Sequence, residues 1–300
     1  MNDIPKIAVL MSTYNVQHFI EEQLQSIFAQ KEVSVELFVR DDGSTDNTLQ
    51  ILERWAESHP LHLTQGQNIG PARSFLELLS TTEAPFYAFA DQDDLWDDDK
   101  LATGIKAIAG LAEPALYFSD TTLVDEKGRF IGNSIGHELN ITKGNALIET
   151  FSAGCTMVLN RRLRDIVVEN LPEEFVYHDR WAFLTAVFLG KVVYDSTPHI
   201  AYRQHGGNVL GAHTEEEKGK SLRRIEKKIE FPRGVAAGQL LKRYKQQLTQ
   251  SDISLIANCC NYDHRFLSRL RLAFYPSYRL AYGGVARRLY WTLRILMKKI

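Results

Sequence analysis

Short apolar runs alternate with helical patterns over the first 95 residues, and this alternation restricts the fold more than any other feature of the chain. Four runs have the length of buried strands: 7–11, 33–39, 62–64 and 85–88. Between the first two, residues 17–29 place apolar side chains at helical spacing. Strands joined by helices pair in parallel and are covered by helices on both faces. The sequence therefore predicts an α/β fold with a mostly parallel sheet flanked by helices.

An acidic cluster follows the fourth run. Asp91, Asp93 and Asp94 place three like charges within four residues, and a bound divalent cation relieves such repulsion. The cluster stands where a strand leaves its sheet, which is where open α/β sheets hold ligands. A cation at this position can also hold a nucleotide diphosphate. The alternative is an ordinary solvated acidic turn.

Polar segments also follow the first two runs. Ser12–Asn15 leaves the first run, and Asp41–Asp46 leaves the second with a glycine suited to a tight turn. A carboxylate at a strand end can accept the imide N–H of uracil or thymine, and a tyrosine can stack on the base. These residue types suit a nucleotide site. The alternative roles are turn residue for Asp42, helix cap for Asp46 and packed aromatic for Tyr14.

Taken together, these motifs resemble those of family 2 glycosyltransferases, which have the GT-A fold that binds nucleotide-diphospho-sugars. Four segments carry the resemblance, in the family's order and approximate spacing: Ser12–Asn15, Asp41–Asp46, Asn68–Gly70 with Arg73, and Asp91–Asp94. The resemblance implies a nucleotide-sugar-binding set of Thr13, Tyr14, Asn15, Asp41, Asp42, Arg73, Asp91 and Gln92. It also implies that Asp91 and Asp93 hold a Mn2+ or Mg2+ ion bound to the donor diphosphate.

The second half of the chain contributes a catalytic candidate. A small-residue turn at 151–156 enters the apolar run 157–159, and small residues let a sugar or diphosphate approach the backbone closely. Farther on, Asp179 opens the helical stretch 182–189. The resemblance makes Asp179 the general base of an inverting transfer, which must take a proton from the acceptor hydroxyl. The alternative is a carboxylate that only complements the helix dipole.

The segment Tyr202–Val209 resembles a Y-R-x-H-x-x-N segment of family members described as rhamnosyltransferases. This favours dTDP-rhamnose as the donor, with a UDP-hexose as the alternative. By the same resemblance, Arg203 faces the diphosphate and His205 completes the metal site or contacts phosphate, where an imidazole suits Mn2+ better than Mg2+. A plain loop residue is the alternative for His205.

Charge divides the chain near residue 217. Residues 1–217 hold 16 Lys+Arg against 33 Asp+Glu, whereas residues 218–300 hold 19 against 4. We therefore expect a GT-A catalytic domain over 1–217 and a basic helical C-terminal extension over 218–300, with helical patterns at 222–231 and 239–248 outside the catalytic core.

The last helix carries one apolar stripe: Val285, Leu289, Leu293, Leu296 and Ile300. A basic helix with such a stripe is typical of a helix that lies at an anionic membrane surface. The alternatives are packing on the catalytic domain or on a second copy in a homo-oligomer. Charge alone also allows nucleic-acid binding, but no nucleic-acid motif accompanies it, so no nucleic-acid partner is expected.

The remaining features concern the compartment. Cys155, Cys259 and Cys260 lack the spacing of a zinc site and are expected to be reduced thiols. No long apolar run follows the start of the chain or occurs elsewhere in it, so we expect neither a secretory leader nor a membrane-spanning segment. We therefore expect a cytoplasmic protein that is peripheral on the inner face of the cell membrane.

These features predict a metal-dependent, inverting glycosyltransferase that moves a sugar, rhamnose first, onto a lipid-linked or cell-surface polysaccharide acceptor. A relative that binds the sugar nucleotide without catalysis is the rival from another class. The presence of both Asp93 and Asp179 favours an enzyme.

Overall fold

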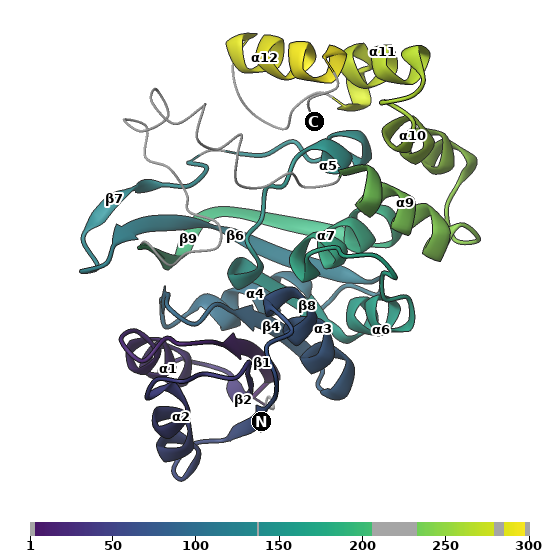
Figure 1. The fold of residues 1–300 in the computed structure, drawn as a ribbon. Coiled ribbons are helices and arrows are strands. Elements are labelled where there is room, and N and C mark those ends of the chain that lie inside the picture. The colour runs from purple at the N-terminus through teal and green to yellow at the C-terminus, as the bar shows by residue number, and fades with distance from the viewer. Residues whose placement is uncertain (1–3, 137, 206–232, 279–284, 298–300) are drawn as a thin grey trace.

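The computed structural model describes residues 4–136, 138–205, 233–278 and 285–297, and its centre is one large sheet (Figure 1). The strands follow the order β3-β2-β1-β4-β8-β6-β9-β5, and β7 pairs with β6. Their bounds are β1 Lys6–Thr13, β2 Ser34–Asp41, β3 Leu61–Gln65, β4 Phe86–Ala90, β5 Leu95–Trp96, β6 Ala115–Asp125, β7 Phe130–Asn133, β8 Met157–Asn160 and β9 Lys191–Gln204. The α/β class is confirmed.

Helices cover both faces of the sheet, as strands with two apolar faces require. One face packs against α1 (Ile20–Phe28), α2 (Thr48–Ala56) and α4 (Lys100–Ile108). The opposite face packs against α3 (Pro71–Thr81), α6 (Arg161–Glu169) and α7 (His178–Leu189), and the short α5 (Lys143–Ile148) joins this layer. The sheet therefore has a separate hydrophobic core on each side.

The sheet is mostly parallel, as predicted, but it also contains antiparallel strands. Strands β1 to β4 pair in parallel, and so do β6 and β9, but β8 runs antiparallel to both β4 and β6. The chain leaves β6 at its carboxyl end and passes through β7, α5 and a 3-10 turn (Gly154–Thr156) before β8 begins. Because β8 starts at the end of the sheet where β6 finishes, it must run in the opposite direction.

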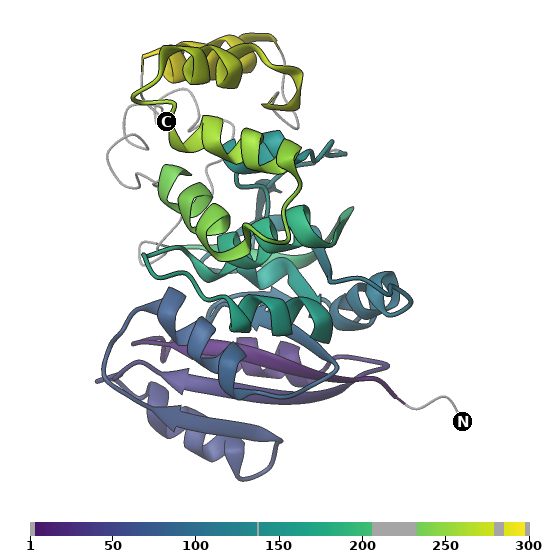
Figure 2. The same ribbon diagram turned by 90° about the vertical axis from the view of Figure 1, so that its right-hand side faces the viewer.

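The C-terminal helices are stacked beyond the second half of the sheet, far from β1 to β3 (Figures 1 and 2). They are α9 (Arg233–Tyr244), α10 (Gln250–Cys260), α11 (Phe266–Phe274) and α12 (Val285–Leu296). Within the described ranges, no helix is both long enough and apolar enough to cross a bilayer.

Helix α9 shares the core of the catalytic part, which corrects the expectation that segment 239–248 lies outside that core. Tyr244 stacks on Trp181 of α7 with 5.5 Å between ring centroids, and Thr185 Oγ1 donates to the Tyr244 hydroxyl at 3.2 Å. Apolar positions of α9 recur on the face turned to α7, and burying them stabilises the pair. The predicted helix at 222–231, the boundary at 217 and Ile300 lie outside the described residues.

Candidate active site

Three strand ends meet at one edge of the sheet and form the candidate site. The acidic loop follows β4, the 3-10 turn precedes β8, and the end of β9 lies beside β5. Strand β5 pairs with β9 so that Leu95 is opposite Ala201 and Trp96 is opposite Ile200. This antiparallel pairing carries the last residues of β9 back to the acidic loop.

His205 contacts the acidic loop directly. Its Nε2 lies 2.6 Å from Asp93 Oδ2, and its ring stacks on Phe19 at 4.8 Å between centroids. Both side chains are mostly buried, at 12% exposure each. A carboxylate and an imidazole held this close form a pair of metal donors, so the predicted grouping of Asp93 with His205 is present in the structure.

Arg203 supports the acidic loop from within the protein. Its side chain is buried, with the guanidinium paired to the Glu22 carboxylate and donating to the carbonyl of Glu126 at 2.7 Å. Its Nε donates to the carbonyl of Asp93 at 3.0 Å, and its backbone N–H to Asp94 Oδ1 at 3.2 Å. Arg203 thus positions the loop, and its contact with a diphosphate stays a prediction.

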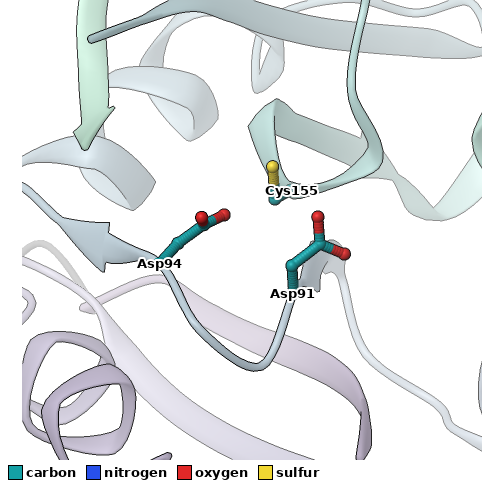
Figure 3. Close-up of side chains that lie close together, drawn as sticks. All are labelled: Asp91, Asp94 and Cys155. Atoms are coloured by element: carbon teal, nitrogen blue, oxygen red, sulfur yellow. The ribbon is translucent and has the colours of Figure 1, made fainter. Parts of the chain in front are cut away.

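A second cluster lies deeper in the same corner (Figure 3). The carboxylates of Asp91 and Asp94 point toward the Cys155 thiol, and the three potential donor atoms lie within 4.8 Å of one another. Burial raises the pKa of Asp94 and of the Cys155 thiol well above their ordinary values, and neighbouring carboxylates raise both further. The cluster therefore favours protonated, neutral groups when no cation is present.

The side chain of Lys100 is buried close to Asp94 and Cys155. Its ammonium is buried, lies 3.7 Å from the centroid of the Trp96 ring and has no hydrogen-bond partner among the described residues. Burial lowers the pKa of Lys100 to about 7. Neither Lys100 nor Cys155 was predicted as a site residue; the available signals were the position of Cys155 in the small-residue turn and of Lys100 just after the acidic loop.

The structure brings Asp179 to the acidic loop from a distant part of the chain. Burial raises the pKa of Asp91 to about 7, and the negative charges of Asp93 and Asp179 add to that rise. Asp179 lies in the first turn of α7, where Oδ1 accepts the N–H of Arg180 at 2.6 Å. The Arg180 guanidinium donates to the carbonyl of Glu149 at 2.6 Å and so ties the start of α7 to the end of α5.

His178 lies on the inner side of the same helix start. It stacks on Phe75 at 4.1 Å and meets Phe89 edge-on at 4.7 Å, both between ring centroids. Burial lowers its pKa to about 4, so the imidazole is neutral at neutral pH. A Cβ on Gly154 would lie 2.8 Å from His178 Nε2 and 3.3 Å from Asp179 Cβ. The turn before β8 therefore packs directly against the helix start that carries Asp179.

Buried aspartates hold the loops on the donor side. Asp41 is fully buried and its carboxylate accepts from Thr13 Oγ1 at 3.0 Å and from the N–H of Ser44 at 2.8 Å. Asp42 pairs with Arg40 and accepts the N–H of Gly70 at 2.8 Å. In this structure Thr13, Asp41 and Asp42 fasten the loops, and their direct contact with a base stays a prediction.

Exposed residues on the same loops are free to meet a nucleotide. Tyr14 is 46% exposed, and its N–H donates to Gln92 Oε1 at 2.8 Å, which joins the first loop to the acidic loop. Asn15 has a φ of 49° and accepts the N–H of Thr45 at 2.8 Å. Arg73 is exposed in the first turn of α3. Tyr14 is thus joined to the acidic loop through Gln92, and the approach of Asn15 and Arg73 to a nucleotide stays a prediction.

The overall arrangement is that of a GT-A glycosyltransferase. The crystal structure of S. aureus TarS (residues 1–349) in complex with UDP-GlcNAc matches this chain with a TM-score of 0.59 at 19% identity, over 97% of this chain and 81% of that chain. The model of glycosyl transferase family 2 matches residues 8–163. The chain belongs to glycosyl transferase family 2.

Two relatives indicate the range of activities among similar chains. The dTDP-rhamnosyl transferase RfbG of Shigella flexneri is 31% identical over 216 residues, which cover 67% of this chain and 74% of that protein. The UDP-Glc:alpha-D-GlcNAc-diphosphoundecaprenol beta-1,3-glucosyltransferase WfgD of Escherichia coli is 28% identical over 158 residues, which cover 52% of this chain and 61% of that protein.

Proposed function

We propose that this glycosyltransferase moves rhamnose from dTDP-rhamnose onto a lipid-linked or cell-surface polysaccharide acceptor, with inversion at the anomeric carbon. The observation that carries the proposal is that the turn before β8 packs against the start of α7 and also meets the acidic loop: a Cβ at Gly154 would lie 3.3 Å from Asp179 Cβ, and the Cys155 thiol lies with the Asp91 carboxylate. The similarity to RfbG supports rhamnose, and the similarity to WfgD supports a lipid-linked acceptor and keeps a UDP-hexose as the second candidate donor.

The roles follow from the chemistry of each group. Asp179 takes the proton from the acceptor hydroxyl as its oxygen attacks the anomeric carbon. Tyr14, on the first loop, and Arg73, in the first turn of α3, are exposed and are the proposed contacts of the base. The turn at Gly154 packs against the start of α7 and so positions Asp179.

The residue types proposed as ligands suit a divalent cation. Asp93 and His205 are in contact, whereas the Asp91 carboxylate lies with Asp94 and Cys155; carboxylates with an imidazole suit Mn2+ and tolerate Mg2+. Burial raises the pKa of Asp91 and the charges of Asp93 and Asp179 add to that rise, and a bound cation would favour the charged carboxylate. The inner corner at Cys155 is less suitable, because the Lys100 side chain faces it. When bound, the cation stabilises charge on the departing diphosphate.

A donor screen with a catalytic variant tests the proposal. Thermal shift with dTDP-rhamnose and UDP-hexoses, with and without Mn2+, identifies the donor by a metal-dependent rise in Tm. Asp179→Asn should keep that rise but lower transfer by about 100- to 10,000-fold. The matched control is Glu21→Gln, because Glu21 is also a first-turn acid, on α1.

The outcomes separate the alternatives. If the rate of transfer by Asp179→Asn is within a few-fold of that of the unmodified protein, Asp179 is not the general base and only complements the helix dipole. A rise with a UDP-hexose alone would replace rhamnose by the second candidate. Donor binding without transfer or donor hydrolysis would favour the non-catalytic relative.

The C-terminal helices supply the proposed contact with an anionic membrane at the cytoplasmic face. Six of their apolar side chains are each more than half exposed: Phe266, Leu267, Phe274, Val285, Leu289 and Leu293. Arg265 just before α11, Arg271 of α11 and Arg288 of α12 are exposed beside them in the sequence. Exposed apolar area with cationic neighbours favours anionic headgroups, at about 1 kcal/mol for each cation near the surface.

Vesicle sedimentation tests this surface. Leu289→Glu combined with Leu293→Glu should reduce binding to anionic vesicles at both low and high salt, because the apolar part of the interaction resists salt. Phe130→Glu is the control, since Phe130 is 69% exposed on the distant β7. Equal sedimentation of all three proteins would exclude membrane binding through α12 and favour a contact with protein.

A further inference from the structure

The loop at 170–177, between α6 and α7, presents two aromatic rings a few residues before Asp179 in the chain. Phe175 is 52% exposed, and its ring and that of Tyr177 meet at 76° with 5.0 Å between centroids. Val176, between them, is buried in the core. The backbone therefore turns the Val176 side chain inward and leaves Phe175 exposed with Tyr177 part-buried against it, although an exposed phenylalanine costs free energy in water.

Helix α9 holds this loop in place. The N–H of Glu173 donates to Gln239 Oε1 at 2.9 Å, and Gln239 Nε2 donates to Glu174 at 2.8 Å. The Glu173 carboxylate also pairs with Lys242 and with Arg243, the latter at 3.1 Å. Since Gln239 itself is buried, the anchor is part of the packed interface between α9 and the catalytic part (Figure 1). The outward position of Phe175 is thus built into the fold.

The aromatic pair lies close to the expected site of reaction. Phe175 precedes Asp179 by four residues and Tyr177 precedes it by two. An extended chain spans at most about 3.6 Å per residue, so the Cα of Phe175 is within about 14 Å of that of Asp179. Sugar units next to the attacking hydroxyl of an acceptor fall within this distance. A pre-positioned contact there loses little conformational entropy on binding.

We propose that Phe175 and Tyr177 form an acceptor subsite that binds a pyranose ring of the acceptor glycan close to the attacking hydroxyl. The C–H groups on the face of a pyranose carry partial positive charge and pack on the negative face of an aromatic ring, while the ring hydroxyls stay in water. The proposal rests on the glycan acceptor proposed above and makes the α9 anchor part of acceptor recognition. The nucleotide-sugar donor is not expected to contact Phe175 or Tyr177.

Two measurements with Phe175→Ala test the subsite. In transfer assays with soluble acceptor, the variant should raise the acceptor KM about three- to tenfold, the size expected for one lost aromatic contact. Donor Kd and the rate of donor hydrolysis without acceptor should not change. Phe175→Trp should restore the acceptor KM, and Phe266→Ala, which removes another exposed phenylalanine, should leave it unchanged.

The second measurement does not depend on turnover. Saturation-transfer NMR with octyl glycosides of rhamnose, glucose and N-acetylglucosamine should show contact of the sugar ring with the unmodified protein, and Phe175→Ala should weaken it. Equal signals for both proteins, or no signal for any glycoside, would overturn the subsite. Loss of vesicle binding in Phe175→Ala with unchanged glycan binding would also overturn it and assign Phe175 to the membrane surface. Failure of the proposed function would appear separately, as absence of donor transfer and hydrolysis.

Discussion

Replacing Gly154 with alanine tests whether the turn before β8 sets the position of Asp179. The added Cβ would lie 2.8 Å from His178 Nε2 and 3.3 Å from Asp179 Cβ. Non-bonded heavy atoms have their optimum at about 3.5–4.0 Å, so the new methyl group overlaps the imidazole by roughly 0.7 Å or more. Either the turn or the start of α7 must move by a similar amount.

The start of α7 is expected to move. The imidazole is confined by Phe75, at 4.1 Å between centroids, and by Phe89, at 4.7 Å, so it cannot rotate away without disturbing the core. Overpacking of this kind costs about 1–3 kcal/mol of stability. A displacement of about 1 Å at a catalytic group can lower the rate about 100-fold. We expect Gly154→Ala to fold, to melt at a lower temperature and to lose about 10- to 100-fold in kcat.

The assay combines single-turnover transfer, donor titration and thermal unfolding. Donor affinity should stay close to that of the unmodified protein, because the overlap is with the helix start and not with the exposed loops around Tyr14. Gly110→Ala is the matched control, since nothing lies within 4 Å of a Cβ at that position. Unchanged kcat and Tm in Gly154→Ala would show that the turn yields freely and does not position Asp179.

Three further variants make separate predictions. Asp93→Asn should abolish Mn2+-dependent nucleotide binding in calorimetric titration without unfolding the protein, and unchanged binding would place the metal elsewhere. Burial lowers the pKa of His178 to about 4 from an ordinary 6.5, so the unfolded chain binds the proton more readily than the folded one. The free energy of unfolding should therefore fall by up to about 3 kcal/mol from pH 6.5 to pH 4. Urea unfolding of His178→Gln should lack this decrease, and an equal decrease in the variant would show that His178 is not its cause. Gly238→Ala, inside α9 with nothing within 4 Å of the new Cβ, should raise the free energy of unfolding by about 0.5–1 kcal/mol, and a lower value would contradict the open packing seen there.

Local sequence patterns correctly predicted most strands and helices in the first half of the fold. The runs predicted as strands coincide with β1 to β4, and the helical spacing at 17–29 coincides with α1 to within a few residues. Such predictions succeed because burial imposes a period on each segment separately. The direction of β8 was not predictable in this way, because it depends on the end of the sheet at which the chain re-enters.

By itself, the sequence determined the order of strands and helices in the first half, the acidic loop after β4, and the motifs that resemble family 2 glycosyltransferases. Only the tertiary structure decided which of those residues are exposed to a ligand. Pairing of β5 with β9 carries His205 to Asp93, and antiparallel β8 carries Cys155 to Asp91. The same packing buries Arg203 among loop carbonyls. The physical reason is that periodicity encodes whether a face is buried, whereas strand pairing and ion-pair choice depend on groups far apart in the chain, whose contacts exist only once the core has formed.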